Sequence, residues 1–320
     1  MASPANQTTL LRWAQGTAAS PPATKNKREA AATEGKTEER ARKRQKASPA
    51  AEPATSPAPQ ASAAPDGPRV ALCVASWNTD GLDGHLCADR AGEVCSILLE
   101  ETPAWDVVFL QEVVPKTARV FVGRLKASGY SCVTEVPSAE YFTLMFVREG
   151  AQAVKVVHAK RVPFGRSAMG RDLIEAWVDV AGHQIRLMTS HFESCREGAE
   201  ERQRQLGVVV EKLQQPLPAI FAGDTNLREA EAQAEKRLAR MTDAWVACGR
   251  DKSAQFTWDL QKNHNKEMPC QSQPRARYDR LWVNEKFEVQ DFRLLGTDKM
   301  AEGCHPSDHF GISACIRLKD

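Results

Sequence analysis

The chain has 320 residues, 42% of them hydrophobic, which is enough for one large domain or two small ones. Its net charge of +2 is unevenly spread, because residues 1–67 hold 10 Lys/Arg and 6 Asp/Glu while the rest holds 33 and 35. Any nucleic-acid contact in the second part must therefore come from local arginine clusters. No apolar run is long enough for a signal peptide or a membrane span, so we expect no membrane partner.

Residues 1–67 are rich in Ala, Pro, Ser, Thr, Lys, Arg and Glu, and Trp13 is their only aromatic residue. Such a segment buries too little apolar surface to offset the entropy of ordering, so we predict a disordered tail. Two basic clusters, at residues 25–28 and 40–46, are typical of a bipartite nuclear-import signal and predict a nuclear protein. The alternative is a solvated charge run.

The start of this tail contains a second short pattern, in which Gln7, Leu10 and Trp13 have the spacing of the peptide that docks on the sliding-clamp protein. The usual second aromatic residue is missing, because Ala14 follows Trp13. The pattern therefore has two interpretations, a clamp-binding peptide or a chance spacing in a polar tail.

The nine cysteines are scattered along the chain and form no C-x-x-C pair. Several lie in apolar runs, so we predict buried free thiols in a reducing compartment. The missing ligand spacing argues against a structural zinc site.

Residues 68–320 are predicted to form one catalytic domain, in which strand-like runs alternate with helical stretches. Strands are predicted at residues 70–77, 107–110, 130–135, 141–147, 153–162, 173–180, 184–189, 217–222, 279–283, 289–295 and 310–318. Helices are predicted at residues 93–100, from about residue 115, at 199–213 and over most of 227–246. About 250 residues with this pattern predict an α/β fold, a four-layer sandwich of two packed mixed sheets flanked by helices.

Polar residues stand at the ends of five of these strands, and residues two apart, such as Asn78 and Asp80, leave a strand on one face. In chain order they are Asn78, Asp80, Glu112, His191, Asp224, Asn226, Asp308 and His309. Each alone has an ordinary explanation as a turn residue, a helix cap or a carboxylate in solvent. Together they supply the side chains that metal-assisted phosphodiester hydrolysis requires.

The order and spelling of these motifs resemble the endonuclease/exonuclease/phosphatase superfamily, and within it the branch of the 5′-tyrosyl-DNA phosphodiesterases. The resemblance covers about residues 70–320 and lies in Trp77-Asn78-Thr79-Asp80-Gly81-Leu82-Asp83, Ser190-His191-Phe192-Glu193-Ser194, Gly223-Asp224-Thr225-Asn226-Leu227-Arg228 and Thr257-Trp258-Asp259. Other branches have Asp-Phe-Asn where this chain has Asp-Thr-Asn, which favours the tyrosyl branch. Vertebrate relatives often begin with a ubiquitin-binding helical domain, for which residues 1–67 have too few apolar residues.

The resemblance implies a monomeric, Mg²⁺-dependent enzyme, with Mn²⁺ as a substitute metal. Its substrate would be a DNA 5′ end that carries tyrosine or a peptide of a type II topoisomerase, and the product a 5′-phosphate. One alternative keeps the fold but changes the substrate, giving an abasic-site endonuclease, a deadenylase or a lipid-headgroup phosphatase. Another is a binding module without activity, which would need losses among Glu112, Asp224, His191 or His309, and none is missing.

The resemblance also implies a division of roles among the strand-end residues. Glu112 is the first choice as metal ligand and Asp80 the second, directly or through water, since Mg²⁺ prefers hard oxygen ligands. Asp224, helped by Asn226, would orient or deprotonate the attacking water.

Two histidines would act on the phosphate itself. His191 and His309 would donate to the non-bridging oxygens, with Asn78 alongside, and Asp279 would hold His309 in one tautomer. Asp308 is a lower-ranked residue behind the metal.

Arginine and aromatic side chains would bind the DNA, since stacking of a base on an aromatic face contributes about 1–3 kcal/mol whatever the base. Ser194 would donate to the phosphate and Tyr141 lie near it, while Trp282 and Phe164 form an apolar wall against the terminal base. For Trp282 the alternative is ordinary core. The remaining predicted DNA contacts are Arg202, Arg228 and Trp258, and for Arg202 the alternative is a solvated helix face.

Overall fold

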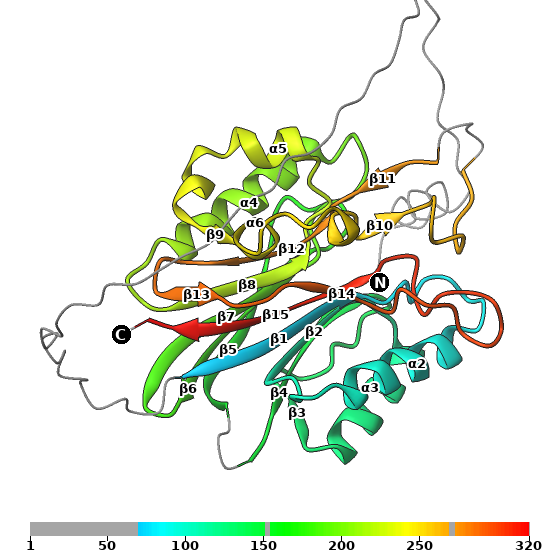
Figure 1. The fold of residues 1–320 in the computed structure, drawn as a ribbon, viewed down its shortest axis with the longest axis horizontal. Coiled ribbons are helices and arrows are strands. Elements are labelled where there is room, and N and C mark those ends of the chain that lie inside the picture. The colour runs from blue at the N-terminus through cyan, green and yellow to red at the C-terminus, as the bar shows by residue number, and fades with distance from the viewer. Residues whose placement is uncertain (1–69, 151–153, 269–272, 320) are drawn as a thin grey trace, which may run out of the picture.

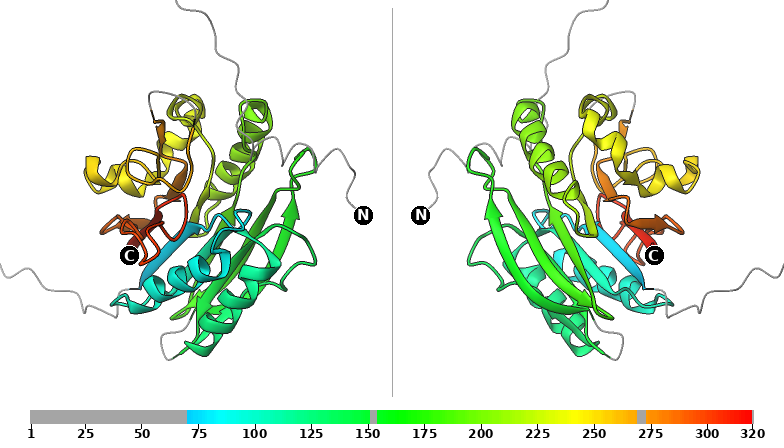
Figure 2. Two further views of the ribbon diagram at one scale, coloured as in Figure 1. Left: turned by 90° about the vertical axis from the view of Figure 1, so that its right-hand side faces the viewer. Right: turned by 90° about the vertical axis from the view of Figure 1, so that its left-hand side faces the viewer.

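Two β-sheets pack face to face, and helices cover both outer faces (Figures 1 and 2). The structure is a computed structural model that describes residues 70–150, 154–268 and 273–319. The predicted four-layer α/β sandwich is confirmed. The predictions for the tail, its import signal and its clamp-binding peptide concern residues outside the described ranges.

The first sheet has seven strands in the order β13-β15-β1-β2-β4-β3, with β14 also paired to β15. Its strands are β1 (Ala71–Asn78), β2 (Val107–Val113), β3 (Tyr130–Cys132), β4 (Phe142–Arg148), β13 (Phe287–Val289), β14 (Arg293–Leu295) and β15 (Gly311–Leu318). The strand predicted at 289–295 is thus two short strands that pair with different parts of β15. Because β1 and β2 run parallel, their carboxyl ends lie side by side.

The second sheet has six strands in the order β5-β6-β7-β8-β12-β9. Its strands are β5 (Lys155–Pro163), β6 (Asp172–Val180), β7 (His183–Ser190), β8 (Ala219–Asp224), β9 (Thr242–Asp243) and β12 (Asp279–Val283). β7 and β8 run parallel and β12 runs antiparallel to β8, so two carboxyl ends and one amino end meet at one edge. A separate ribbon pairs β10 (Trp258–Asp259) with β11 (Arg275–Ala276).

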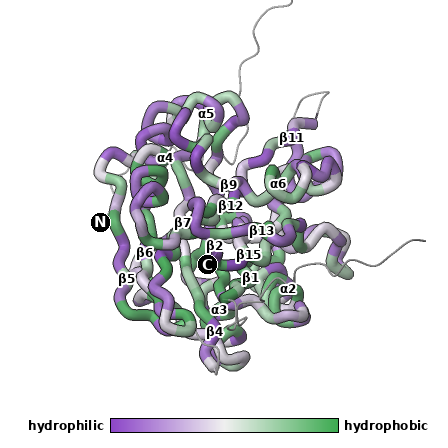
Figure 3. The backbone as a smooth tube through the Cα atoms, turned by 60° about the vertical axis from the view of Figure 1, so that its left-hand side comes forward, coloured by the Kyte–Doolittle hydropathy of each residue, from purple (hydrophilic) through white to green (hydrophobic). Residues whose placement is uncertain are grey.

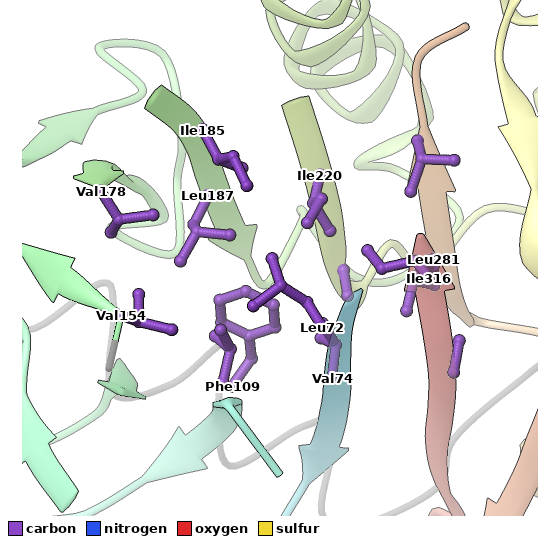
Figure 4. Close-up of a cluster of buried hydrophobic side chains, with 14 of the residues drawn as sticks. Leu72, Val74, Phe109, Val154, Val178, Ile185, Leu187, Ile220, Leu281 and Ile316 are labelled. Atoms are coloured by element: carbon purple, nitrogen blue, oxygen red, sulfur yellow. The ribbon is translucent and has the colours of Figure 1, made fainter. Parts of the chain in front are cut away.

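Apolar side chains from both sheets fill the space between them (Figure 4). On the long strands they occupy every second position, as expected for strands with one face toward the partner sheet. Burying one such side chain contributes about 1.5–3 kcal/mol, so this layer is a main source of stability. Its members include Leu72, Val74, Phe109, Val154, Val178, Ile185, Leu187, Ile220, Leu281 and Ile316.

Helices α2 (Cys87–Glu100) and α3 (Pro115–Ala127) cover the first sheet, and α4 (Ala199–Leu213) covers the second (Figure 1). In α4 the apolar residues recur at helical spacing, as Leu206, Val209, Val210 and Leu213, and all are buried. The opposite, hydrophilic face of α4 lies at the surface (Figure 3). No helix within the described ranges is long and apolar enough to cross a membrane.

The segment predicted to be mostly helical at 227–246 is broken into shorter elements. It contains α5 (Glu229–Ala234), the 3₁₀ helix η1 (Lys236–Arg240), strand β9 and the start of α6 (Ala244–Ala247), before a second 3₁₀ helix, η2 (Lys252–Ala254). The chain leaves the helical path because β9 adds to the sheet edge beside β12, a tertiary contact that overrides local propensity.

The prediction that the cysteines are free thiols is wrong for one pair. Cys73 on β1 and Cys315 on β15 stand directly opposite each other and form a disulfide. They are 242 residues apart in sequence, so only the strand pairing brings them together. Cys87 and Cys95 are buried free thiols, as predicted.

Candidate active site

Strands of both sheets end at one edge, and most of the predicted polar residues gather there. Asn78 ends β1, Glu112 is the second-last residue of β2 and Asp224 ends β8, while Asp279 begins β12. The two histidines flank the same edge, since His191 follows β7 and bridges to Asp224 and His309 precedes β15. The residues of this edge are Asn78, Glu112, His191, Asp224, Asp279 and His309, and all are buried.

Asn78 joins the two sheets through one amide group. Its Nδ2 donates to Glu112 Oε1 at 3.1 Å and to Asp224 Oδ2 at 2.8 Å. Its Oδ1 accepts the backbone N–H of Asp80 at 3.0 Å. The carboxylates of Glu112 and Asp224 are therefore held in a fixed relation before any substrate arrives.

Glu112 has a backbone conformation that few residues adopt, with φ at +54° next to a register shift in the β2–β4 pair. The N–H of Gly81 donates to the Glu112 carbonyl at 3.0 Å, and a Cβ on Gly81 would lie 2.2 Å from that oxygen. Such outliers cost about 1–3 kcal/mol each and persist where surrounding contacts enforce them. The glycine thus permits the close approach that turns the Glu112 side chain into the site.

His309 is paired with Asp279. Its Nδ1 lies 2.7 Å from Asp279 Oδ2, and its Nε2 lies 3.9 Å from Asp224 Oδ2. Burial lowers the pKa of His309, but Asp279, Asp308 and Asp224 together raise this pKa well above its usual value. The imidazole therefore favours its protonated form, in which Nε2 can donate.

His191 lies in a different electrostatic environment. Its Nδ1 is 2.8 Å from the Tyr141 hydroxyl, and its Nε2 is 2.9 Å from Asn226 Nδ2 and 3.3 Å from Asp224 Oδ2. Burial, followed by the charge of Arg171, lowers the pKa of His191 well below its usual value. The pKa values of the two histidines are thus shifted in opposite directions, that of His309 upward and that of His191 downward.

The carboxyl groups of Asp80, Glu112 and Asp224 are harder to ionise than isolated ones. Burial and then Asp279 raise the pKa of Asp224 to about 7. Burial and then Asp308 raise the pKa of Glu112, and raise that of Asp80 further. Buried carboxyl groups that repel one another favour a bound cation, which would offset both effects.

Two groups of side chains bring metal-binding atoms within 4.8 Å of one another: Glu112, His191 and Asp224, and Asp224, Asp279 and His309. Asp80 belongs to neither group. Its Oδ2 lies 3.3 Å from Arg90 Nη1 and 3.1 Å from Lys266 Nζ.

The rim of the site holds several of the residues predicted to bind DNA. Tyr141, Phe164 and Trp258 are half-buried and Arg228 is exposed. The Trp258 indole donates to Asp308 Oδ2 at 3.3 Å, and its ring lies 5.7 Å from that of Tyr278. Ser194 is buried and accepts from Arg171 at 3.1 Å.

Two of the predicted DNA contacts are wrong, because their side chains point into the protein. Arg202 is 0% exposed and pairs with Glu231 at 2.7 Å, since α4 turns this residue toward α5. Trp282 is 2% exposed, stacks on Phe221 with ring centroids 5.5 Å apart, and donates to Asp243 at 3.1 Å. Trp282 is thus ordinary core and Arg202 a buried ion-pair partner.

Two further residues beside the site, Arg171 and Glu193, have no role in the sequence prediction. Arg171 lies over the Tyr141 ring, with its guanidinium carbon 4.9 Å from the centroid. It follows a glycine in a loop and belongs to no motif, so nothing in its local sequence marks it. Glu193 lies inside the 190–194 motif, and its place in that motif is the sequence signal that marks it.

A two-sheet α/β sandwich with carboxylates, amides and histidines at one sheet edge supplies the side chains that metal-assisted phosphoester hydrolysis requires. The chain belongs to the Endonuclease/Exonuclease/phosphatase family, whose model matches residues 75–309. It is 39% identical over 251 residues to tyrosyl-DNA phosphodiesterase 2 of Danio rerio, covering 75% of this chain and 65% of that relative. The chain thus spans just under two thirds of that relative's length.

Solved structures show the same similarity. The crystal structure of D. rerio TDP2 complexed with single strand DNA product has a TM-score of 0.69 and 35% identity, covering 77% of this chain and 98% of that one. The crystal structure of TDP2 from C. elegans has a TM-score of 0.69 and 30% identity, covering 78% of this chain and 75% of that one. The resemblance to the tyrosyl-DNA phosphodiesterase branch is thereby confirmed.

Proposed function

We propose that this protein hydrolyses the 5′-phosphotyrosyl bond that joins a DNA 5′ end to a peptide of a type II topoisomerase, leaving a 5′-phosphate. The observation that carries the proposal is the convergence of Glu112, Asp224 and His309 at one buried sheet edge. The similarity to TDP2 structures, one of them complexed with single strand DNA product, supports DNA as the substrate.

The residues present fit a divalent cation with hard-oxygen preference. Glu112 offers a buried carboxylate whose pKa is raised by burial and by Asp308, as expected for a group that a cation would complement. We assign Glu112 as the direct ligand of Mg²⁺ or Mn²⁺ and Asp80 as a ligand through water, since Arg90 and Lys266 already contact Asp80. When bound, the cation neutralises charge on the phosphoryl oxygens.

Asp224 acts on the attacking water in this proposal. A general base works best when its pKa is near the operating pH, and burial raises the pKa of Asp224 to about 7. The Asn78 amide and the Asn226 backbone N–H each donate to one of its oxygens, at 2.8 and 2.9 Å. The carboxylate is therefore oriented before it accepts a proton.

His309 stabilises the charge that develops on the phosphate. Asp279 occupies Nδ1 and keeps the ring protonated, so Nε2–H is free to donate to a non-bridging oxygen. His191, whose lowered pKa favours the neutral form, and Asn78 contribute no positive charge. They hold the neighbouring groups of the site in position by hydrogen bonds. A tyrosine phenol, with a pKa near ~10, leaves more readily than an alkyl alcohol and needs less help from a general acid.

A gel assay with a 5′-phosphotyrosyl oligonucleotide tests the proposal, with and without Mg²⁺ and beside a duplex with an abasic site. We expect Mg²⁺-dependent release of an oligonucleotide with a 5′-phosphate and no cut at the abasic site. Cleavage of the abasic duplex alone would show that the substrate is an abasic site and not a phosphotyrosyl bond. Loss of activity in Asp224→Ala and Glu112→Ala, with folding retained, would tie the reaction to this edge.

We also propose that the protein acts in the nucleus. The two basic clusters at residues 25–28 and 40–46 support this location. Replacing the cations of both clusters by Gln in a fluorescent fusion should move the protein out of the nucleus, and an unchanged distribution would contradict the proposal.

A further inference from the structure

Residues 164–171, here called the tip loop, connect β5 to β6, and they run from the half-buried Phe164 to the buried Arg171. The backbone closes on itself, because the N–H of Phe164 donates to the Arg171 carbonyl at 3.0 Å and the N–H of Ser167 donates to the Phe164 carbonyl at 2.9 Å. The loop is therefore a folded unit, and something must fix it relative to the site.

Glu193 makes that connection. One of its carboxylate oxygens accepts the backbone N–H groups of Ala168 at 2.9 Å and Met169 at 3.1 Å. The other accepts the Ser167 hydroxyl at 2.6 Å and the Gln205 amide at 3.3 Å. Glu193 is 3% exposed, so water competes little for these bonds.

The carboxylate itself is held from the side of α4. The backbone N–H of Glu193 donates to Gln205 Oε1 at 2.7 Å. Gly198 leaves room for the side chain, since a Cβ there would lie 2.8 Å from Glu193 Cγ. Glu193 thus links a loop that hangs from β5 and β6 to the helix that covers the second sheet.

A short series of contacts leads from the loop to Tyr141 and Ser194. Ser167, which donates to Glu193, accepts the backbone N–H of Arg171 at 2.8 Å. The guanidinium of Arg171 then stacks on Tyr141 and donates to Ser194 Oγ at 3.1 Å. Arg171 therefore depends on the loop for its place beside the site.

We propose that Glu193 is a positioning residue, which holds the tip loop so that Arg171 lies between Tyr141 and Ser194 and meets the scissile phosphate. The role rests on the proposed function, because it gives Arg171 a phosphate to contact. Glu193 touches no reacting atom and acts only through the loop.

The test compares Glu193→Gln with Glu200→Gln, the same change on an exposed residue of α4. Glutamine keeps the size of the side chain but replaces one acceptor by a donor, so the four bonds cannot all form. On the phosphotyrosyl oligonucleotide, kcat should fall about 10-fold or more in Glu193→Gln and stay at the wild-type value in Glu200→Gln. A double-mutant cycle with Arg171→Ala shows the route: the double variant should be within about 2-fold of Arg171→Ala alone. Additive losses would overturn the proposal.

Amide hydrogen exchange of the peptide that spans 164–171 gives a readout without catalysis. Exchange should be faster in Glu193→Gln than in the wild type and in Glu200→Gln, because the Ala168 and Met169 amides lose their acceptor. Unchanged exchange would overturn the proposal. If the wild type cleaves no phosphotyrosyl bond, the proposed function fails, and the exchange result alone decides whether Glu193 holds the loop.

Discussion

Asp279 Oδ2 lies 2.7 Å from His309 Nδ1, while the Asp279 backbone pairs directly with Asp224 across strands β12 and β8. The other oxygen of Asp279 is buried and has no hydrogen-bond partner within the described ranges. One carboxylate thus acts on two reacting groups: it helps raise the pKa of His309 and adds to burial in raising that of Asp224.

This relation predicts the effect of Asp279→Asn on the pH dependence of the reaction. Removing the negative charge lowers the pKa of His309, so its proton is lost at a lower pH and the alkaline limb of kcat/KM moves down. It also lowers the pKa of Asp224, so the acid limb moves down as well. We expect both limbs to shift by about one unit or more, which means about 10-fold less activity on the alkaline side.

A full profile of kcat/KM against pH checks this prediction. The exposed Asp298→Asn is the matched control and should keep the wild-type profile. If Asp279→Asn lowered activity equally at all pH values, Asp279 would have only a structural role.

Metal binding at Glu112 can be measured without turnover. A ligand that binds only the folded state stabilises it by about 2.7 kcal/mol at 100 times its Kd, so Mg²⁺ should raise the melting temperature of the wild type. Glu112→Gln, nearly the same size, should lose most of this rise and about 100-fold or more of the activity. Exposed Glu285→Gln is the control. If Mg²⁺ raised the melting temperature equally in Glu112→Gln and in the wild type, Glu112 would not be the metal ligand.

Gly81 and Gly84 offer a matched pair in the loop after β1. A Cβ on Gly81 would lie 2.2 Å from the Glu112 carbonyl oxygen, whereas one on Gly84 meets no described atom within 4 Å. Gly81→Ala should displace Glu112 and cost about 100-fold in kcat, with about 1–3 kcal/mol lost from the free energy of unfolding. Gly84→Ala should change neither. Equal activities would show that the site tolerates a shift of the Glu112 backbone.

The strand ends could be predicted from the sequence because each combines an apolar run with an abrupt polar residue. Asp224 follows the apolar run 219–222 after one glycine and His191 follows the strand that ends at Ser190, and parallel neighbours place their carboxyl ends together. The direction in which a side chain points from a helix is harder to predict from the sequence. Arg202 lies among charged neighbours on α4, and helical spacing alone does not tell which charged residue faces a buried partner on α5.

The other features that could not be predicted from the sequence depend on contacts between segments far apart in the chain. The Cys73–Cys315 bond depends on the pairing of the first and last long strands, which no local pattern reveals. Arg171 acquires its place only when the tip loop folds against Glu193, whose own neighbours come from α4. Long-range packing therefore decides what a spacing argument cannot.

Arg228 and Arg202, both predicted from the sequence to contact DNA, should behave differently when they are replaced by alanine. Arg228 is exposed at the rim, with 45% of its side chain accessible, so Arg228→Ala should weaken binding of single-stranded DNA and reduce the slope of log K against log salt by about 0.7. The free energy of unfolding of Arg228→Ala should differ from that of the wild type by less than about 0.5 kcal/mol. Arg202→Ala leaves Glu231 without its buried partner and should cost about 3 kcal/mol of unfolding free energy with an unchanged salt slope. Salt titrations of DNA binding and denaturant unfolding of both variants separate the two effects. A reduced salt slope in Arg202→Ala at unchanged stability would place that side chain on the DNA after all.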